Sequence, residues 1–145
     1  MIRDLIREFD DEKGFYESVY DWYYTTVATS FKDEVEEYCK VVIFGDEYAM
    51  SVQELYTYDR HVAVELWRDY VSKSLEEDFH VWVERCIIDE IDEFTKEFQQ
   101  WLASQDDERV SDVIVALMSG NIDVTEIVTD WLYDRLSTED WNYPA

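Results

Sequence analysis

Apolar residues recur at helical spacing over the longest uninterrupted stretch of the chain, which runs from Leu75 to Ala103. The stripe consists of Leu75, Phe79, Trp82, Cys86, Ile87, Ile91, Phe94, Phe98, Trp101 and Leu102. This period places the apolar side chains on one side of an α-helix, where they can be buried together. A continuous helix over this stretch would be roughly 40 Å long. We therefore expect an all-α fold built around one long central helix.

Shorter patterns of the same period predict the other helices of a single-domain bundle, which would have about five or six helices over residues 1–145. Helices are expected over residues 2–14, 15–38, 51–71, 110–120 and 123–136. The chain has only 3 Gly and 1 Pro, and this scarcity of helix-breaking residues favours long helices. The polar segment 104–107 is expected to end the long helix, and residues 141–145 are expected to form a tail.

Polar residues also predict where several helices begin and end. Ser51 and Glu54 have the spacing of a capping box, in which each side chain bonds to the backbone of the other. Ser74 and Glu77 have the same spacing and could start the long helix. Gly120 is expected to end one helix, because glycine readily adopts the left-handed conformation found there.

Two segments are expected to interrupt the helical pattern. Thr25, Thr26 and Thr29 weaken the second helix, which we expect to kink or break there. The β-branched run from Val41 to Phe44 fits either a short strand or a buried helix end. Because no partner strand is evident, we favour the helix end.

The composition is that of a folded chain rather than of a disordered acidic tail, since hydrophobic residues make up 47% and aromatic residues 17%. Cys39 and Cys86 lie in apolar-periodic stretches and are expected to be buried thiols. The first residues alternate charged with apolar side chains, unlike a signal peptide. No apolar run approaches the ~18 residues of a membrane span. We therefore expect a cytoplasmic protein.

The aromatic residues divide into two groups by their position in the helical patterns. Four tryptophans lie on apolar stripes and are expected in the core: Trp67, Trp82, Trp101 and Trp131. Five tyrosines fit the stripes less well: Tyr20, Tyr24, Tyr48, Tyr56 and Tyr58. The second group would supply surface contacts or an apolar seam between the two copies of a homodimer.

The net charge limits the partners that this chain can bind. Asp and Glu number 36 against 12 Lys and Arg, which gives a formal charge of −24. Direct binding of nucleic acid is disfavoured, because it requires Lys and Arg to neutralise phosphates. An anionic membrane surface would also repel the chain. A partner that attracts so acidic a protein should itself be basic.

No motif in the sequence predicts catalysis, a cofactor or a metal site. Glu77 and His80 have the Glu-x-x-His spacing of di-iron bundles, but the second copy that such a site needs is absent. Acids between Asp89 and Glu93 resemble the magnesium-binding motifs of all-α nucleotide pyrophosphohydrolases. They flank Ile91 on the apolar stripe, so most of them should point to solvent. We predict that the protein is not an enzyme.

Acidic side chains form rows in the expected helices, and these rows are the predicted partner-binding surface. The residues concerned are Asp33, Glu34, Glu36, Glu37, Glu76, Glu77, Asp78, Glu84, Asp89, Glu90, Asp92, Glu93 and Glu97. Carboxylates three or four residues apart lie ~5–6 Å from one another along a helix and destabilise it. Selection for folding alone would place lysines between them, so we expect the rows to serve binding.

In size, acidity, helical pattern and tyrosine content, the chain resembles phage-encoded DNA mimics, among them anti-restriction and anti-CRISPR proteins. The resemblance includes no alignable motif, so no residue role is carried over. It implies an inhibitor that occupies the basic nucleic-acid groove of a restriction enzyme, a CRISPR effector or another DNA-binding protein. It also implies action in the host cytoplasm and, for many such proteins, a homodimer.

A second reading is a non-enzymatic acidic interaction module, such as an adaptor or an immunity protein, whose basic partner is not a nucleic-acid-binding groove. Adaptation to high salt is a third reading. It fits less well, because salt-adapted proteins tend to lose the large apolar residues that are abundant here. Competition with DNA for the partner separates the first reading from the second.

Overall fold

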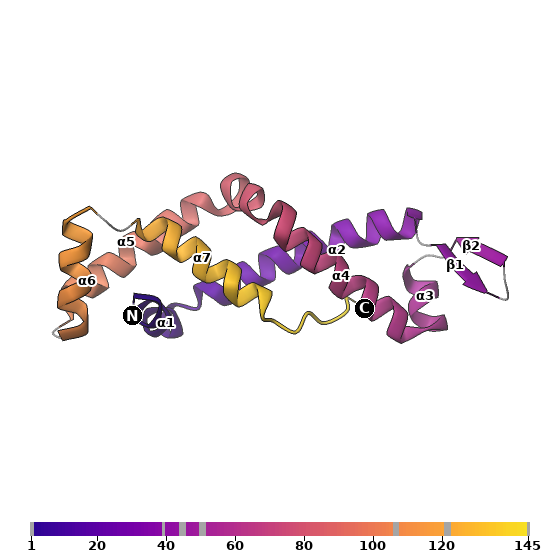
Figure 1. Ribbon diagram of the computed structural model, residues 1–145, viewed down its shortest axis with the longest axis horizontal. Coiled ribbons are helices and arrows are strands. Elements are labelled where there is room, and N and C mark those ends of the chain that lie inside the picture. Colours follow the sequence, from indigo (N-terminus) through magenta and orange to yellow (C-terminus); the bar gives the residue numbers. More distant parts are fainter. Residues whose placement is uncertain are drawn as a thin grey trace. The chain divides into compact units, whose positions relative to one another are not determined.

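The computed structural model describes the backbone of residues 2–38, 40–43, 46–49, 52–105, 108–120 and 123–144. Within these ranges it describes all side chains except those of residues 34–38, 40–43, 46–49, 52, 53, 55 and 109. The elements are α1 (Ile2–Lys13), α2 (Phe15–Tyr38), β1 (Lys40–Ile43), β2 (Asp46–Ala49), α3 (Val52–Tyr58), α4 (Arg60–Trp82), the π-helical segment η1 (Val83–Ile87), α5 (Ile88–Ser104), α6 (Glu108–Met118) and α7 (Val124–Ser137) (Figure 1).

The fold is all-α apart from one small hairpin. α4, η1 and α5 follow one another without a gap and form a single helical run from Arg60 to Ser104. Six helices are therefore present in the described part of the chain, and one of them is much longer than the others. This confirms the predicted fold class, although the long helix begins well before the expected start at Leu75.

The prediction of a helix end at Val41 to Phe44 is wrong for Val41–Ile43, which belong to strand β1. β1 pairs with β2 in an antiparallel hairpin, with Lys40 opposite Ala49 and Ile43 opposite Asp46. The partner strand follows almost directly in the sequence, and β-branched residues favour the extended conformation of a strand. Phe44 itself lies outside the described residues.

The break expected at Thr25, Thr26 and Thr29 does not occur, because α2 is one helix from Phe15 to Tyr38. A kink at these threonines stays a prediction. Each threonine hydroxyl donates to the backbone carbonyl four residues earlier, at 2.9 Å in all three cases. A bond of this kind satisfies the hydroxyl within the helix, although it slightly destabilises a helix and often bends it. Threonine therefore lowers the helix propensity here without interrupting the helix.

The single helix expected over residues 51–71 is two helices, which separate at Asp59. Oδ1 of Asp59 accepts a hydrogen bond from the backbone N–H of Val62 at 3.4 Å and so caps the start of α4. The capping box predicted at Ser74 is also wrong, because Ser74 lies inside α4, where its hydroxyl is 2.6 Å from the hydroxyl of Tyr23. The other predicted cap, Ser51, lies outside the described residues.

Glycine ends two helices as the sequence predicted. Gly14 follows α1 with φ +68° and Gly120 follows α6 with φ +75°, a backbone conformation that other residues rarely adopt. A side chain would have open space at both positions, so the backbone angle and not crowding requires glycine there. At the start of α7, Oδ1 of Asp123 accepts from the N–H of Glu126 at 3.3 Å, as a capping residue does.

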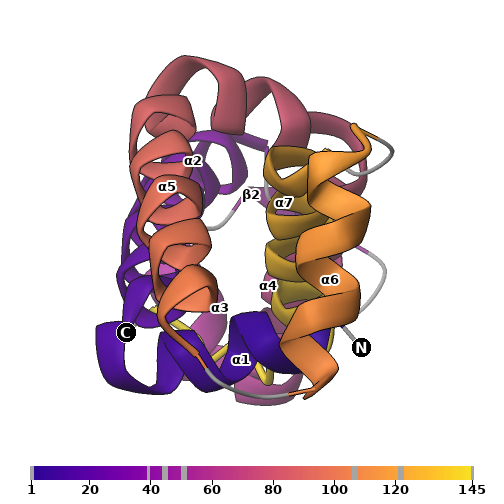
Figure 2. The same ribbon diagram turned by 90° about the vertical axis from the view of Figure 1, so that its left-hand side faces the viewer.

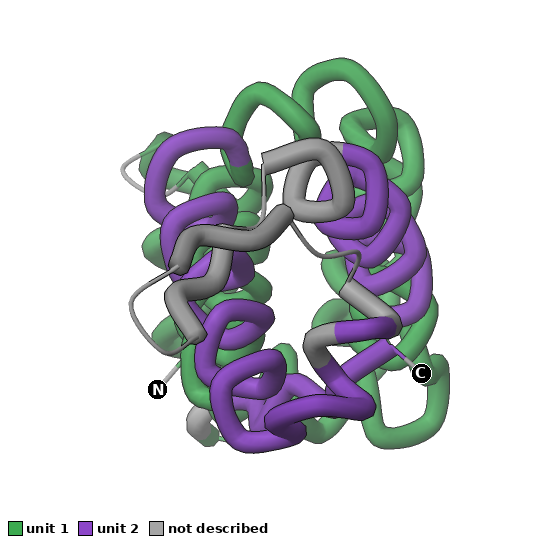
Figure 3. The backbone as a smooth tube through the Cα atoms, turned by 90° about the vertical axis from the view of Figure 1, so that its right-hand side faces the viewer, with its two compact units in different colours: residues 1–20, 79–138 green, residues 21–78, 139–145 purple. Residues whose placement is uncertain are grey.

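The chain divides into two compact units (Figure 3). Unit 1 contains residues 1–20 and 79–138, and unit 2 contains residues 21–78 and 139–145. Both α2 and α4 pass from one unit to the other. The single domain expected over residues 1–145 stays a prediction.

Unit 1 is held together by an aromatic core between α1, α5 and α7. The Phe9 ring of α1 lies 5.3 Å from Phe94 and 5.8 Å from Phe98, both of α5. Trp131 of α7 stacks on Phe94 with the ring centres 6.5 Å apart. Two views show α5 and α7 side by side (Figures 1 and 2). Aromatic pairs of this kind contribute about 0.5–1.5 kcal/mol each beyond the burial of their surface.

The π-helical segment η1 corrects the prediction that Cys86 is a buried thiol. A π-turn holds more residues than an α-turn, which shifts the positions that face the core. Val83 and Ile87 are both buried, and Cys86 between them is exposed. The apolar stripe then continues through Ile91 into α5. The other cysteine, Cys39, lies outside the described residues.

Unit 2 contains most of α2 and α4, the hairpin of β1 and β2, α3 and the C-terminal tail. Trp67 is fully buried, and its indole N–H donates to the backbone carbonyl of Trp141 at 3.2 Å. Tyr24 stacks on Trp141 with the ring centres 6.2 Å apart, and its hydroxyl donates to the carbonyl of Asn142 at 2.8 Å. The residues that were expected to form a simple tail therefore complete the core of this unit.

Two of the four tryptophans predicted in the core, Trp67 and Trp131, are buried. Trp82 and Trp101 are half-buried, so the prediction is wrong for these two. Among the tyrosines expected at the surface, Tyr58 is 59% exposed, whereas Tyr20, Tyr24 and Tyr56 are half-buried. The side chain of Tyr48 lies outside the described residues. A dimer seam stays a prediction.

Replacing Trp141 by Ala is expected to lower the free energy of unfolding by about 3–5 kcal/mol, because it removes a buried indole and leaves a cavity. Trp22 provides the matched control, since it lies in the same unit and is 43% exposed. Its replacement by Ala should cost clearly less. Chemical denaturation followed by circular dichroism measures both losses. Equal losses would mean that the tail adds nothing to the core.

Candidate functional site

The described part of the predicted binding surface is densest on α5. Asp89, Glu90, Asp92 and Glu93 are all exposed, whereas Ile91 between them is fully buried. At about 100° of rotation per residue, these four carboxylates cover the side of the helix opposite Ile91. We call these four residues the α5 acidic face. The expectation that these acids point to solvent is confirmed.

The other predicted binding residues lie in three different settings. Glu84 is exposed on η1 in unit 1, while Glu97 is half-buried and forms an ion pair with Lys13 at 3.4 Å. Four more are exposed in unit 2: Asp33, Glu76, Glu77 and Asp78. The side chains of Glu34, Glu36 and Glu37 lie outside the described residues. The structure thus places the four residues of the α5 acidic face together on one helix, whereas Glu97 is engaged in an ion pair with Lys13.

Both units are strongly acidic. Unit 1 has 20 acidic residues against 7 Lys and Arg, and unit 2 has 16 against 5. Several of these cations are engaged with acids in the described side chains: Arg3 with Asp134, Lys13 with Glu97, Arg68 with Asp140 and Arg135 with Asp10. These four pairs leave the excess of acids over bases unchanged, so most of the negative charge of both units stays uncompensated.

Asp10 is a buried carboxylate at the junction of three helices, and its side chain is 5% exposed. Its Oδ1 accepts from the backbone N–H of Phe15 at 2.6 Å and of Tyr16 at 3.3 Å, at the start of α2. Its Oδ2 lies 3.7 Å from Nη1 of Arg135, near the end of α7. The Arg135 guanidinium also lies 3.9 Å from the centre of the Tyr16 ring. This cluster joins α1, α2 and α7.

Burial raises the pKa of Asp10 above its ordinary value of 3.8, because the charged form loses its hydration. The hydrogen bonds from Phe15 and Tyr16 and the charge of Arg135 act in the opposite direction, and Asp11 adds to the rise. Within the described part of the chain, the polar partners of this carboxylate are the backbone N–H groups of Phe15 and Tyr16 and the guanidinium of Arg135. We read the cluster as a structural junction and not as a catalytic site.

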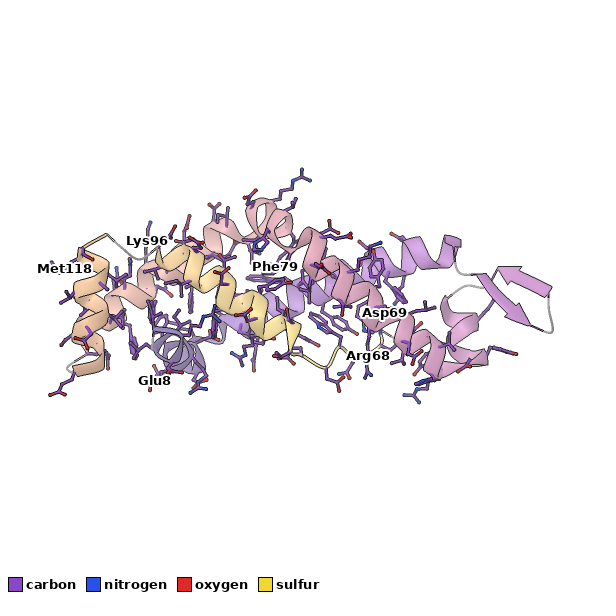
Figure 4. The ribbon with its side chains drawn as sticks, in the orientation of Figure 1. Glu8, Arg68, Asp69, Phe79, Lys96 and Met118 are labelled. Carbon is purple, nitrogen blue, oxygen red and sulfur yellow. The ribbon has the colours of Figure 1, made fainter. Side chains whose placement is uncertain are left out.

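A pocket lies between α5 and the first turn of α7 in unit 1, with a volume of about 510 Å³. Its walls on the α5 side are Asp92, Thr95, Lys96 and Gln99. Figure 4 shows Lys96 on α5 near the start of α7. The pocket therefore adjoins the α5 acidic face, with which it shares Asp92.

Two further findings concern metals and membranes. Within the described ranges, no three side chains of His, Cys, Asp or Glu converge on a point where they could hold a metal ion. His80 is exposed and stacks on the Tyr133 ring, with the ring centres 5.9 Å apart. None of the described helices combines the length and the apolar character needed to cross a membrane.

Comparison with known proteins found no protein family model, no curated protein and no solved structure that matches this chain. Its function must therefore be argued from its own residues and their arrangement.

The sequence reasoning missed Asp10 and Thr95, although both leave a signal. Asp10 follows Ile6 by four residues, so an acid occupies a position on the apolar stripe of α1. Thr95 follows Ile91 in the same way on α5. A polar residue on an apolar stripe must find a partner or lose stability, because an unpaired polar group is costly to bury. Asp10 has such partners in Phe15, Tyr16 and Arg135, whereas the hydroxyl of Thr95 has none among the described residues.

Replacing Asp10 by Asn should change how stability depends on pH. A carboxyl whose pKa is higher in the folded than in the unfolded state binds protons on folding, so its contribution is present below the unfolded pKa and is lost as pH rises through the folded pKa. The stability of the wild type relative to D10N should therefore increase as the pH falls from about 7 to about 3.

Urea denaturation of both proteins across this pH range measures the difference, and the other carboxylates cancel because the two proteins share them. A difference that stays constant would show that the folded and unfolded pKa values of Asp10 are equal. A difference that falls with decreasing pH would show that Arg135 and the backbone N–H groups outweigh burial.

Proposed function

We propose that this protein is an acidic inhibitor of the DNA-mimic type, which occupies the basic nucleic-acid groove of a target protein. The observation that supports this most directly is the α5 acidic face, where four exposed carboxylates lie on one side of a helix. The inhibitor would act stoichiometrically, without catalysis or a cofactor. Restriction enzymes and CRISPR effectors are the class of target that we favour, in the cytoplasm of the cell that contains them.

The spacing of the charges supports mimicry. The rise from Asp89 to Glu93 is about 6 Å, and four carboxylates lie within it, so the face carries roughly one charge per 1.5–2 Å of helix axis. Duplex DNA carries one negative charge per ~1.7 Å of its axis. A groove that neutralises phosphates would meet a similar density of negative charge on this helix.

The rest of the charge distribution supports a basic partner as well. Both units contain far more acids than bases, so the field around either of them attracts a cationic surface. Association with such a target should be fast at low salt and should weaken steeply as salt screens the charges. Direct binding of nucleic acid has no comparable support.

One observation favours the second reading, an ordinary protein-interaction module. On α6, Val115 is 67% exposed and Met118 is 85% exposed, three residues apart on the same side of the helix. Exposed apolar side chains of this size suit a protein interface better than a groove lined with lysine and arginine. In that case the acids would serve to attract the partner and the apolar residues would hold it.

Capture from a bacterial lysate at low salt, followed by elution with duplex DNA, tests the proposal. The immobilised protein should retain a nucleic-acid-binding protein that duplex DNA displaces. Once purified, that protein should lose its own DNA binding when the inhibitor is added. A captured partner that stays bound despite excess DNA would instead support the interaction module.

Neutralising the α5 acidic face with D89N, E90Q, D92N and E93Q together should weaken binding to the captured target more than about tenfold, while each single change should weaken it less than about threefold. Binding titrations by fluorescence anisotropy measure the affinities. Individual exposed charges contribute little, so only their collective loss removes the field.

The matched control removes four acids from four other helices of unit 1, with E12Q, E17Q, D112N and E126Q. These side chains are all exposed, so the net charge changes equally without emptying one face. The control should retain most of the affinity. If both variants lose binding equally, net charge and not the α5 acidic face determines the affinity. If one single substitution abolishes binding, the site is specific and mimicry is wrong.

A further inference from the structure

The residues that follow α7 include an extended segment, which belongs to unit 2. Residues 140–144 form neither helix nor strand. Trp141 is 5% exposed and Pro144 is also buried, whereas Tyr143 is half-buried and Asn142 is exposed. An extended backbone with some side chains buried and others exposed is the arrangement of a peptide bound to a protein surface.

Side chains of α2 and α4 bind the backbone of this segment. The indole N–H of Trp67 donates to the carbonyl of Trp141 at 3.2 Å, and the hydroxyl of Tyr24 donates to the next carbonyl, that of Asn142, at 2.8 Å. Burial raises the pKa of Tyr24 above its ordinary value of 10.0, so the hydroxyl stays protonated and able to donate at neutral pH. Both donors bind carbonyl groups, which every peptide has.

Aromatic rings bind the side chains of the segment and so select among peptides. The Trp141 ring stacks on Tyr24, with the ring centres 6.2 Å apart. The Tyr143 ring stacks on Tyr56 at 4.4 Å and meets Phe31 edge-on at 6.2 Å. Aromatic pairs prefer such geometries. We call the following four residues the aromatic surface of unit 2: Tyr24, Phe31, Tyr56 and Trp67.

The two long helices of unit 2 also contact each other directly, without the segment. The hydroxyl groups of Tyr23 on α2 and Ser74 on α4 lie 2.6 Å apart. The Phe31 ring of α2 lies 5.2 Å from Trp67 and 5.4 Å from Tyr70, both of α4. These contacts remain when the segment leaves. Stretches outside helices and strands open at a lower free energy than core elements do.

We propose that the aromatic surface of unit 2 is a peptide-binding site, which residues 139–144 cover in the free protein and which a partner protein occupies in their place. The partner presents an extended segment in which Tyr follows Trp by two residues and Pro comes next, because this is the pattern that the surface binds within the chain itself. Extended segments that contain proline suit aromatic surfaces, since they lose little conformational freedom on binding.

Charge contributes little to this site. Arg68 of α4 forms an ion pair with Asp140 at 3.0 Å, but both side chains are more than half exposed, and such pairs are weak (Figure 4). The site uses none of the residues of the α5 acidic face. It therefore does not rest on the proposed inhibition, and either proposal can fail without the other.

The segment of the chain competes with any partner for the aromatic surface. A tethered segment has an effective concentration in roughly the millimolar range, so the wild type should bind a free peptide weakly. Weakening the segment should open the site. Replacing Trp141 by Ala does this, because it removes the buried indole of the segment.

A fluorescent peptide with the sequence of residues 139–144, blocked at both ends, tests the proposal against the whole chain. W141A should bind it at least about tenfold more tightly than the wild type in anisotropy titrations. The peptide should also raise the melting temperature of W141A, because it binds the folded state. If W141A is unfolded alone, the same titration should restore its circular dichroism. Y143A provides a second, milder variant. A peptide that neither binds nor stabilises W141A and Y143A would overturn the proposal.

Changes in the peptide and in the surface establish where the peptide binds. A peptide with Ala in place of Trp should bind W141A about tenfold or more weakly than the original peptide. In the W141A chain, Y24F removes the donor to the peptide backbone and should weaken binding about threefold or more. Y58F is the matched control, since Tyr58 also lies in unit 2 and is 59% exposed, and it should leave the affinity unchanged. Equal effects of Y24F and Y58F would place the peptide elsewhere and overturn the proposal.

A second copy of this chain contains the same segment and is the alternative occupant. Analytical ultracentrifugation of the wild type and of W141A over a wide range of concentrations separates the two cases. A wild type that stays monomeric while W141A binds the peptide would support a partner protein. A wild-type dimer that W141A does not form would show that copies exchange their segments, and it would overturn the partner peptide.

Discussion

The arrangement of unit 1 depends on the contacts that the buried carboxylate of Asp10 makes with α2 and α7. It accepts hydrogen bonds from two backbone N–H groups at the start of α2, and it lies beside Arg135 of α7. One side chain of α1 therefore connects three helices. Burying a charge is costly unless it is paired and hydrogen-bonded. Here the compensation comes first from the backbone N–H groups of Phe15 and Tyr16 and then from Arg135, in a chain with only 12 basic residues. The ring centres of Tyr16 and Trp131 lie 3.9 Å and 5.6 Å from the same guanidinium.

The shortage of cations also explains why the other acids lie outside. A carboxylate can be buried only with a partner, and among the described side chains Asp10 is the one acid that is buried. Most of the other described acids are exposed on helices whose inner sides form the core. Neighbouring carboxylates on a helix cost a few tenths of a kcal/mol per pair. The aromatic contacts in unit 1 and around Trp67 and Trp141 in unit 2 offset this cost. The helix α5 shows both roles at once, with Phe94 and Phe98 inward and the acidic face outward.

Periodicity predicted most helices because it reports local physics. The ends of two helices at Gly14 and Gly120 and the start of the last helix near Asp123 depend on neighbouring residues and were predicted correctly. The break predicted in α2 does not occur, because each threonine hydroxyl bonds to a backbone carbonyl of the same helix. The helix end predicted at Val41 was wrong, because the sequence reading did not recognise β2 as the partner strand. The exposure of Cys86 could not be predicted, because a π-helical turn changes which side of the helix faces inward without changing the sequence pattern.

The sequence by itself determined the helical fold class, the excess of negative charge and which side of α5 carries the carboxylates. These follow from composition and from the period of the α-helix, which act within a few residues. The tertiary structure decided that Arg135 lies beside Asp10, that the indole N–H of Trp67 donates to the carbonyl of Trp141, and that the hydroxyl of Thr95 is buried without a hydrogen-bond partner among the described residues. Each of these depends on which distant segments pack together. The packing of distant segments is determined by the sum of many weak contacts, and it produces no periodic pattern in the sequence.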